Sequence, residues 1–164
     1  MNSFKTWLRR AGRGIASSYD GFTLVELMVI IAIVGILLII SFPTFRQAQN
    51  RAQDRAAHAV LRDSLTTAKV YYADNENYGV TSSDAAFESD LEALTPSINF
   101  GPMATASQSV VGFVRGDQQV VFTLRSTTGI WFCISDDAAA SVSYDSDSSL
   151  ADVDTAAECD QGYW

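Results

Sequence analysis

Few residues in this chain have the type and spacing that a catalytic site or a metal site requires. The 164 residues include two cysteines and one histidine, too few for a zinc module of the Cys₄ or Cys₂His₂ kind. His58 has no catalytic partner recognisable in the sequence, which also lacks a Ser/His/Asp order, a phosphate-binding loop and metal-ligand spacing. We therefore predict that the protein is not an enzyme, that it needs no cofactor, and that His58 is a surface residue.

Glu26 is distinguished by its setting. It is the only charged residue in the 24-residue segment 22–45. As a helix this segment would reach about 36 Å, which is enough to cross a bilayer. A carboxylate at membrane depth costs about 2.5–3.5 kcal/mol on insertion scales. Glu26 should therefore have a partner, unless it lies at the headgroup level as a solvated helix cap.

The residues that precede this segment predict its orientation. Residues 1–21 carry four bases against Asp20, a net charge of +3. The positive-inside rule places this basic flank in the cytoplasm and the C-terminus outside. A secretory signal would have a shorter apolar core followed by small residues. We therefore predict a retained single-pass membrane segment.

Residues 46–75 are predicted to continue the same helix. Their apolar positions recur at spacings of three to five. These positions are Ala48, Ala52, Ala56, Val60, Leu65, Ala68 and Tyr72. The segment has five bases and three acids, a net charge of +2. Pro43 should kink the helix or melt it locally, unless it is a tolerated irregularity of a membrane helix.

The remaining residues, 76–164, have the composition of a globular head. A loop is followed by one short helix that ends before Pro96. Three β-like runs then occupy residues 109–115, 119–125 and 130–135, and their short connections predict sequential antiparallel strands. Residues 136–164 contain eight acids and no base, so this tail would be disordered on its own.

The first residues of the apolar segment resemble those of a known family. Gly21 to Glu26 read GFTLVE, with a basic leader before them and an apolar helix after them. This arrangement resembles the type IV pilin family. The resemblance implies an α+β ladle in which a long N-terminal helix packs on a small antiparallel sheet. It divides the chain into a removed leader (1–21), a transmembrane and filament-core helix (22–45), an amphipathic helix (46–75) and a head (76–164).

The family resemblance also implies processing and assembly. A membrane prepilin peptidase would cut after Gly21, and the new amine of Phe22 would be methylated. An assembly platform would then move the subunit from the cytoplasmic membrane into an extracellular helical filament. In such a filament Glu26 can meet the Phe22 amine of a neighbouring copy and fix the axial register, since breaking a buried ion pair costs several kcal/mol.

The charge distribution offers a second contact between subunits. Removal of the leader would change the net charge from −8 to −11, and residues 76–164 hold two bases against fourteen acids. The cationic helix 46–75 can therefore lie beside the acidic heads of adjacent subunits, unless both are merely solvated surfaces. An acidic chain gives no sign of binding nucleic acid.

Cys133 and Cys159 would both be exported by the predicted topology. An even pair of cysteines in an oxidising compartment predicts a disulfide, with two free buried thiols as the alternative. The pair also looks like the C-terminal disulfide-bounded region of many type IV pilins.

Four acids near the C-terminus are weak candidates for a calcium site. Asp145, Asp147, Asp152 and Asp154 offer oxygen ligands, but they lack the glycine and the terminal glutamate of an EF-hand loop. A solvated acidic loop is the simpler interpretation.

Taken together, the residues and the resemblance favour the major structural subunit of a type IV pilus, serving adhesion, motility or DNA uptake. One alternative is a pseudopilin of a type II secretion system. Another is a monomeric membrane-anchored binding protein, although a simple anchor would need neither Glu26 nor the cleavage motif.

Overall fold

The computed structural model describes residues 21–79, 83–138 and 141–159. Except for Gly21, the predicted leader lies outside these residues. The chain divides into two units, Met1–Pro43 and Thr44–Trp164.

One helix, α1, runs from Leu24 to Asn75 and contains Pro43 in its interior. The helix is continuous through this proline, so local melting, one of the two predicted outcomes, does not occur. A proline in a helix removes one backbone donor, and neighbouring groups can compensate for that loss. A kink at Pro43 stays a prediction.

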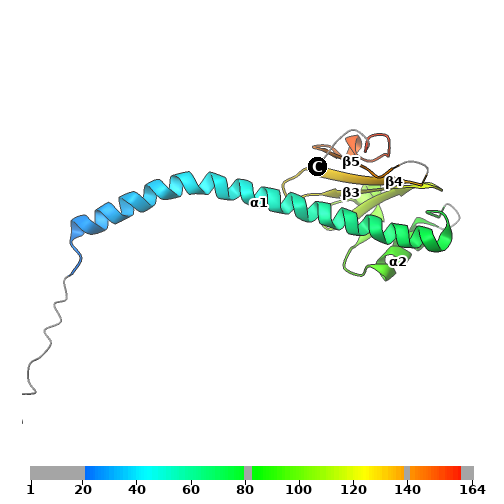
Figure 1. The fold of residues 1–164 in the computed structure, drawn as a ribbon, viewed down its shortest axis with the longest axis horizontal. Coiled ribbons are helices and arrows are strands. Elements are labelled where there is room, and N and C mark those ends of the chain that lie inside the picture. The colour runs from blue at the N-terminus through cyan, green and yellow to red at the C-terminus, as the bar shows by residue number, and fades with distance from the viewer. Residues whose placement is uncertain (1–20, 80–82, 139–140, 160–164) are drawn as a thin grey trace, which may run out of the picture. The chain divides into compact units, whose positions relative to one another are not determined.

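The second unit is built around a five-stranded sheet (Figure 1). Its strands, in spatial and sequence order, are β1 (Phe100–Pro102), β2 (Val111–Arg115), β3 (Gln119–Arg125), β4 (Trp131–Asp137) and β5 (Ser143–Asp147). All neighbours pair antiparallel except β1 and β2, which are parallel. The α+β class and the three central strands are confirmed, and the two edge strands are additions.

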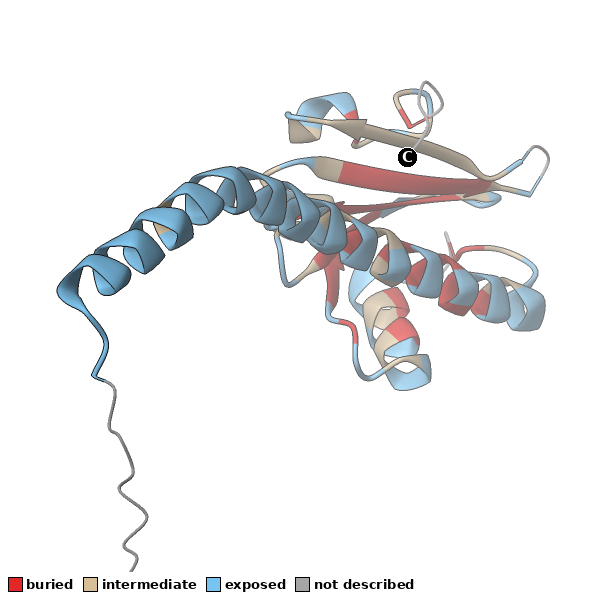
Figure 2. Cartoon of the chain, turned by 60° about the vertical axis from the view of Figure 1, so that its left-hand side comes forward, coloured by how far each residue is buried: buried red, intermediate tan, exposed pale blue. Residues whose placement is uncertain are grey.

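The helical part of this unit covers one face of the sheet. Buried residues of α1 and of α2 (Asp84–Leu94) share a core with alternate residues of the central strands, such as Phe122 and Ile134 (Figure 2). The helix predicted before Pro96 is therefore confirmed. Ser83 caps α2, because its hydroxyl oxygen accepts a hydrogen bond from the backbone N–H of Ala86 at 3.2 Å.

The predicted apolar stripe of α1 is only partly correct. Leu65 and Ala68 are buried, whereas Ala48, Ala52 and Ala56 are exposed. The buried face begins at Ala57, where the sheet starts to cover the helix. It consists of Ala57, Leu61, Ser64, Leu65, Thr67, Ala68 and Tyr71.

Two polar residues belong to this buried face because their hydroxyl groups are satisfied within the helix. The Ser64 hydroxyl donates to the Val60 carbonyl at 2.8 Å, and the Thr67 hydroxyl donates to the Asp63 carbonyl at 2.9 Å. Hydrogen bonding to the carbonyl four residues earlier lets these side chains pack as small, nearly apolar groups.

The opposite face of the sheet is covered by the C-terminal segment, which includes one short 3₁₀ helix, Leu150–Asp152. Val121 and Cys133 on this face form a second buried cluster with Val153 and Cys159. A short 3₁₀ helix, Met103–Thr105, follows β1, and Met103 packs against the same cluster. The acidic tail is therefore ordered over residues 141–159.

Candidate assembly site

The start of α1 is defined by a side-chain cap. Thr23 precedes the helix, and its hydroxyl oxygen accepts a hydrogen bond from the backbone N–H of Glu26 at 3.2 Å. Glu26 lies in the first turn, where its carboxylate is favoured by the helix dipole. The sequence T-x-x-E is a capping-box signal for a helix start. This signal was available in the sequence and would have predicted the cap.

The first unit presents a continuous apolar surface. Between Phe22 and Phe45 the exposed fraction of the large hydrophobic side chains ranges from 45% at Ile30 to 76% at Ile39. This part of α1 is long and apolar enough to cross a membrane. An exposed apolar surface of this length requires lipid or another protein surface to cover it.

In the second unit, Arg115 joins the loop after α1 to the sheet. Its guanidinium donates to the carbonyls of Tyr78 and Gly79, at 2.9 Å for Tyr78, and forms an ion pair with Asp84 at 2.9 Å. It also lies over the Phe87 ring, with its Cζ 4.8 Å from the ring centroid. Arg115 therefore holds three segments of the head together.

A second polar network joins α1 to β4. The buried Asp136 accepts a hydrogen bond from the Tyr78 hydroxyl and forms an ion pair with Lys69 at 3.0 Å. Burial, together with the hydrogen bond to Asp136, raises the pKa of the Tyr78 hydroxyl well above its usual value. The sequence showed no signal for either network, since both depend on contacts between distant segments.

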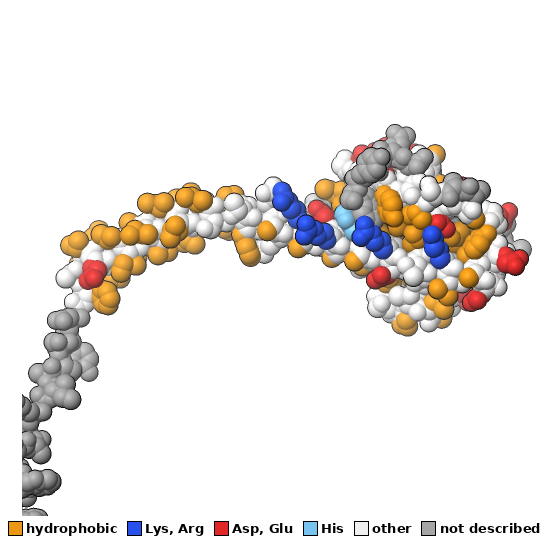
Figure 3. All heavy atoms as spheres, in the orientation of Figure 1, with side chains coloured by type: hydrophobic (Ala, Val, Ile, Leu, Met, Phe, Trp, Pro, Cys, Tyr) orange, Lys and Arg blue, Asp and Glu red, His pale blue; other side chains and the backbone are white. Residues whose placement is uncertain are grey.

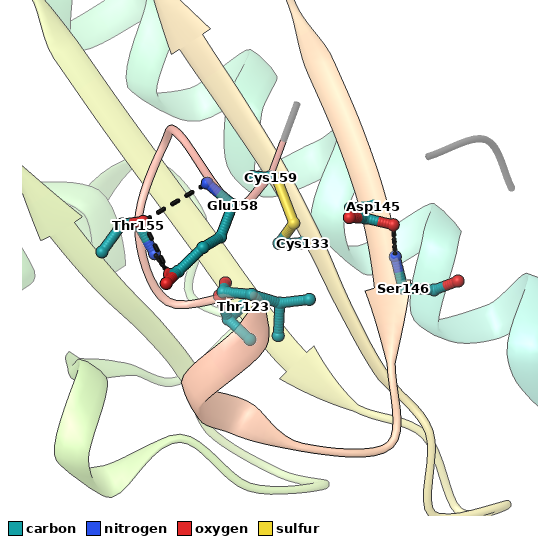
Figure 4. The surroundings of a disulfide bond; sticks show 8 residues. Thr123, Cys133, Asp145, Ser146, Thr155, Glu158 and Cys159 are labelled. Carbon is teal, nitrogen blue, oxygen red and sulfur yellow. Dashed lines mark hydrogen bonds between the residues drawn. A yellow bond between two sulfur atoms is a disulfide. The ribbon is translucent and has the colours of Figure 1, made fainter. Parts of the chain in front are cut away.

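A disulfide joins Cys133 of β4 to Cys159, with 5.9 Å between the two Cα atoms (Figure 4). The C-terminal segment is held further by Thr123, whose hydroxyl donates to the Val153 carbonyl at 2.9 Å. Both side chains of the disulfide are fully buried. The bridge thus fastens the C-terminal segment to the back of the sheet.

The four calcium candidates do not form a metal site. Among the residues that the structure describes, no group of three or more His, Cys, Asp or Glu side chains could hold a metal ion. Asp145 accepts instead from the backbone N–H of Ser146 at 2.7 Å, and Asp147 from that of Ser149 at 3.0 Å. Hydrogen bonds from Ser149 and Ser148 lower the pKa of Asp147.

Asp154 interacts with a further acid of this segment, Glu158. Burial and the neighbouring Glu158 raise the pKa of Asp154. Glu158 accepts from the Thr155 hydroxyl at 2.6 Å, which lowers the pKa of its own carboxyl group (Figure 4). In the part of the chain that the structure describes, Asp145, Asp147, Asp152 and Asp154 therefore do not gather around one point.

Comparison with known proteins bears on the N-terminal segment first. The family described as "Prokaryotic N-terminal methylation motif" matches residues 17–42. The chain is 34% identical over 90 residues to the type IV wide pilus major component PilA4 of Thermus thermophilus, an alignment that covers 54% of this chain and 67% of that relative. The chain belongs to the type IV pilin family. Pilins are structural proteins, so the expectation that the chain is not an enzyme follows from its family.

Two further relatives align over more of this pilin. It is 28% identical over 143 residues to the type IV major alpha-pilin of Moraxella bovis, covering 76% of this chain and 90% of that relative. It is also 28% identical over 121 residues to the type IV major pilin protein PilE of Neisseria gonorrhoeae, covering 69% and 72%. No solved structure matches the chain significantly.

A row of bases follows the pilin helix within the second unit. Arg51, Arg55, Arg62 and Lys69, hereafter the basic row, are all exposed. Their spacings of four, seven and seven residues place them along one side of a 3.6-residue helix. The Lys and Arg side chains accordingly follow one another along α1 in Figure 3.

His58 lies beside this row and is not the surface residue that we predicted. It is partly buried, and its ring meets the Phe132 ring edge-on with 4.5 Å between the centroids. Burial and the nearby Arg62 lower the pKa of His58, with Asp54 opposing them. Asp54 itself accepts from the hydroxyls of Ser126 and Thr128, at 2.7 and 2.6 Å. These contacts tie α1 to the turn between β3 and β4.

Proposed function

We propose that this pilin is the major subunit of a type IV pilus, assembled through its N-terminal helix. The observation that carries the proposal is the exposed apolar surface of residues 22–45, in which Glu26 is the only charge. Lipid covers such a surface in the membrane, and the helices of neighbouring subunits cover it in a filament.

The order of the segments follows from this function. The leader (1–21) stays in the cytoplasm and is removed, and residues 22–45 anchor the subunit in the cytoplasmic membrane with the head outside. A prepilin peptidase cuts between Gly21 and Phe22 and methylates the Phe22 amine. The assembly platform then transfers the subunit to the extracellular filament, where 46–75 packs against the head (76–164).

Glu26 sets the register of one subunit against the next. Cleavage leaves the Phe22 amine close to Glu26 in sequence, and both lie at the start of an apolar helix. In a dry filament core the carboxylate of one copy pairs with the amine of a neighbour. Removing one partner of a buried pair costs about 3–5 kcal/mol, so misaligned subunits are strongly disfavoured.

The alternative of a secretion pseudopilin has less support. Of the proteins to which this pilin is similar, PilA4 is named as a major component of a type IV pilus and PilE as a type IV major pilin. No contact or site in the described residues favours a secretion role over a pilus. A monomeric anchored binding protein would have no use for a single carboxylate in its membrane helix.

The proposal is tested on filaments sheared from cells that produce this chain. Electron microscopy should show pili, and mass spectrometry of the sheared material should give a chain that begins at Phe22 and carries one extra methyl group. Assembled material that still begins at Met1, or a processed chain that is found only in the membrane, would contradict the proposal.

A further inference from the structure

The basic row contains two arginines whose charge is not neutralised within the subunit. Lys69 pairs with Asp136. In contrast, neither Arg51 nor Arg55 forms an ion pair with any residue in the described part of the chain. Both are exposed and lie one helical turn apart, so together they present a strong local positive charge.

A hollow of opposite charge lies at the far end of the same helix. It has a volume of about 310 Å³ and is lined by Tyr71, Asp74, Asn75, Asp90, Ala93 and Leu94. We call it the acidic hollow. Helices α1 and α2 both end beside it, and neither has a basic residue in its last turn. The negative ends of the two helix dipoles therefore add to the charges of Asp74 and Asp90.

The head itself has little positive charge to place in this hollow. Residues 76–164 contain two bases. Arg115 forms an ion pair with Asp84 and donates hydrogen bonds to the carbonyls of Tyr78 and Gly79. Arg125 lies over the Trp131 ring, with its Cζ 5.6 Å from the ring centroid. Both bases of residues 76–164 therefore already have other contacts, and neither lines the hollow.

Arg51 and Arg55 cannot reach the hollow of their own subunit. Arg55 and Asp74 are 19 residues apart on one helix, which separates them by about 28 Å. Two copies of the chain can bring the surfaces together. Because the two surfaces differ, each contact leaves one row and one hollow free, so that the contact can repeat along a filament without closing into a dimer.

We infer that Arg51 and Arg55 of one subunit dock into the acidic hollow of a second copy. The inference rests on the proposed filament and adds the surfaces through which the heads recognise each other. A guanidinium suits this role because its planar fork can donate two parallel hydrogen bonds to a carboxylate. Asp74 and Asp90 are the acceptors on the neighbouring copy.

Charge reversal in the full chain tests this contact. Arg51→Glu/Arg55→Glu and Asp74→Arg/Asp90→Arg should each reduce sheared surface filaments by about tenfold or more, because like charges then oppose each other. The fourfold variant should recover filaments, since the attraction is restored in the opposite sense. Asp63→Arg/Asp117→Arg is the matched control, with an equal charge change outside the hollow, and should assemble like the wild type.

The outcomes separate this inference from the proposed function. If the wild type makes no filaments, the proposed function fails. If the wild type makes filaments and either reversal assembles normally, or if the fourfold variant fails to recover filaments while its Cys133–Cys159 bridge still forms, the docking inference fails.

Cross-linking provides a measurement that does not depend on yield. Filaments of the Arg55→Cys/Asp90→Cys variant, treated with a short bis-maleimide, should give a ladder of covalent oligomers. Filaments of Arg55→Cys/Asp63→Cys should stay monomeric under the same treatment. A monomer-only pattern in the first variant would overturn the inference.

Discussion

Thr23 caps the helix through the backbone N–H of Glu26, with 3.2 Å between donor and acceptor. The cap comes from Thr23, which follows the proposed cleavage point between Gly21 and Phe22. Cutting after Gly21 would therefore leave the helix start intact, with Glu26 held in its first turn. The one carboxylate of the apolar segment is then four residues away, in sequence, from the amine that processing would create.

Arg115 should be a major determinant of head stability. In a soluble fragment that starts at Thr44, Arg115→Met should lower the free energy of unfolding by about 2 kcal/mol, because the carbonyls of Tyr78 and Gly79 lose a buried donor. Asp84 is largely exposed, so losing the ion pair itself contributes little. Chemical denaturation measures the change.

Arg125→Met is the control for this prediction. Arg125 is exposed and contacts one ring and one carbonyl, so its loss should cost less than about 1 kcal/mol. Equal destabilisation by the two substitutions would show that Arg115 does not join the segments as described.

The Tyr78 hydroxyl should make head stability depend on pH in the alkaline range. In the unfolded chain this group ionises near its ordinary pKa of 10.0, whereas in the fold its pKa is raised and the proton is retained. Above pH 10 the folded state therefore binds more protons than the unfolded state. The contribution of Tyr78 to the free energy of unfolding is fully present below pH 10 and decreases as the pH rises above it. The slope is about 1.4 kcal/mol per pH unit.

Tyr78→Phe isolates this contribution. Denaturation of the same fragment between pH 9 and 11 should show a shallower loss of stability for the variant than for the wild type, whatever their difference at neutral pH. Parallel curves for the two proteins would rule out Tyr78 as the group responsible.

The disulfide should stabilise the head through its C-terminal segment. Cys133 and Cys159 are 26 residues apart. Closing a loop of that length restricts the unfolded chain, and this loss of entropy raises the free energy of unfolding by about 3–4 kcal/mol. The fragment should show no free thiol until it is denatured and reduced. Cys133→Ala/Cys159→Ala should unfold at a correspondingly lower denaturant concentration, and reduced wild type should match it. Rapid thiol labelling of untreated protein would refute the bridge.

Much of the fold was predictable because local patterns determine it. The central strands are rich in Val, Phe and Ile between turn residues, and the short helix ends before Pro96. The two edge strands carry weaker signals. β1 has three residues and ends in Pro102, and β5 reads SYDSD, a composition that suits an exposed edge and has little intrinsic preference for a strand.

The limits of prediction were set by contacts between distant segments. The helix stripe was partly wrong because the sheet covers α1 only from Ala57 onward, so the three earlier alanines are exposed. It also omitted Ser64 and Thr67, which are buried with hydroxyl groups that hydrogen-bond within the helix. Arg115, Tyr78 and Asp136 meet only after the sheet and both helices are in place. The assembly motif lies within six consecutive residues, from Gly21 to Glu26, and was therefore visible from the sequence.

The central claim is that Glu26 directs assembly, and the yield of surface filaments from Glu26→Ala tests it most directly. Asp63→Ala is the control, since it also removes one carboxylate from the helix. Glu26→Ala should still enter the membrane, because the substitution removes a charge that insertion disfavours. It should also still be cut, because the cleavage point at Gly21 is unchanged. The account predicts that processed Glu26→Ala subunit accumulates in the membrane with few or no filaments, while Asp63→Ala assembles normally. Filaments of Glu26→Ala at the wild-type level would contradict it.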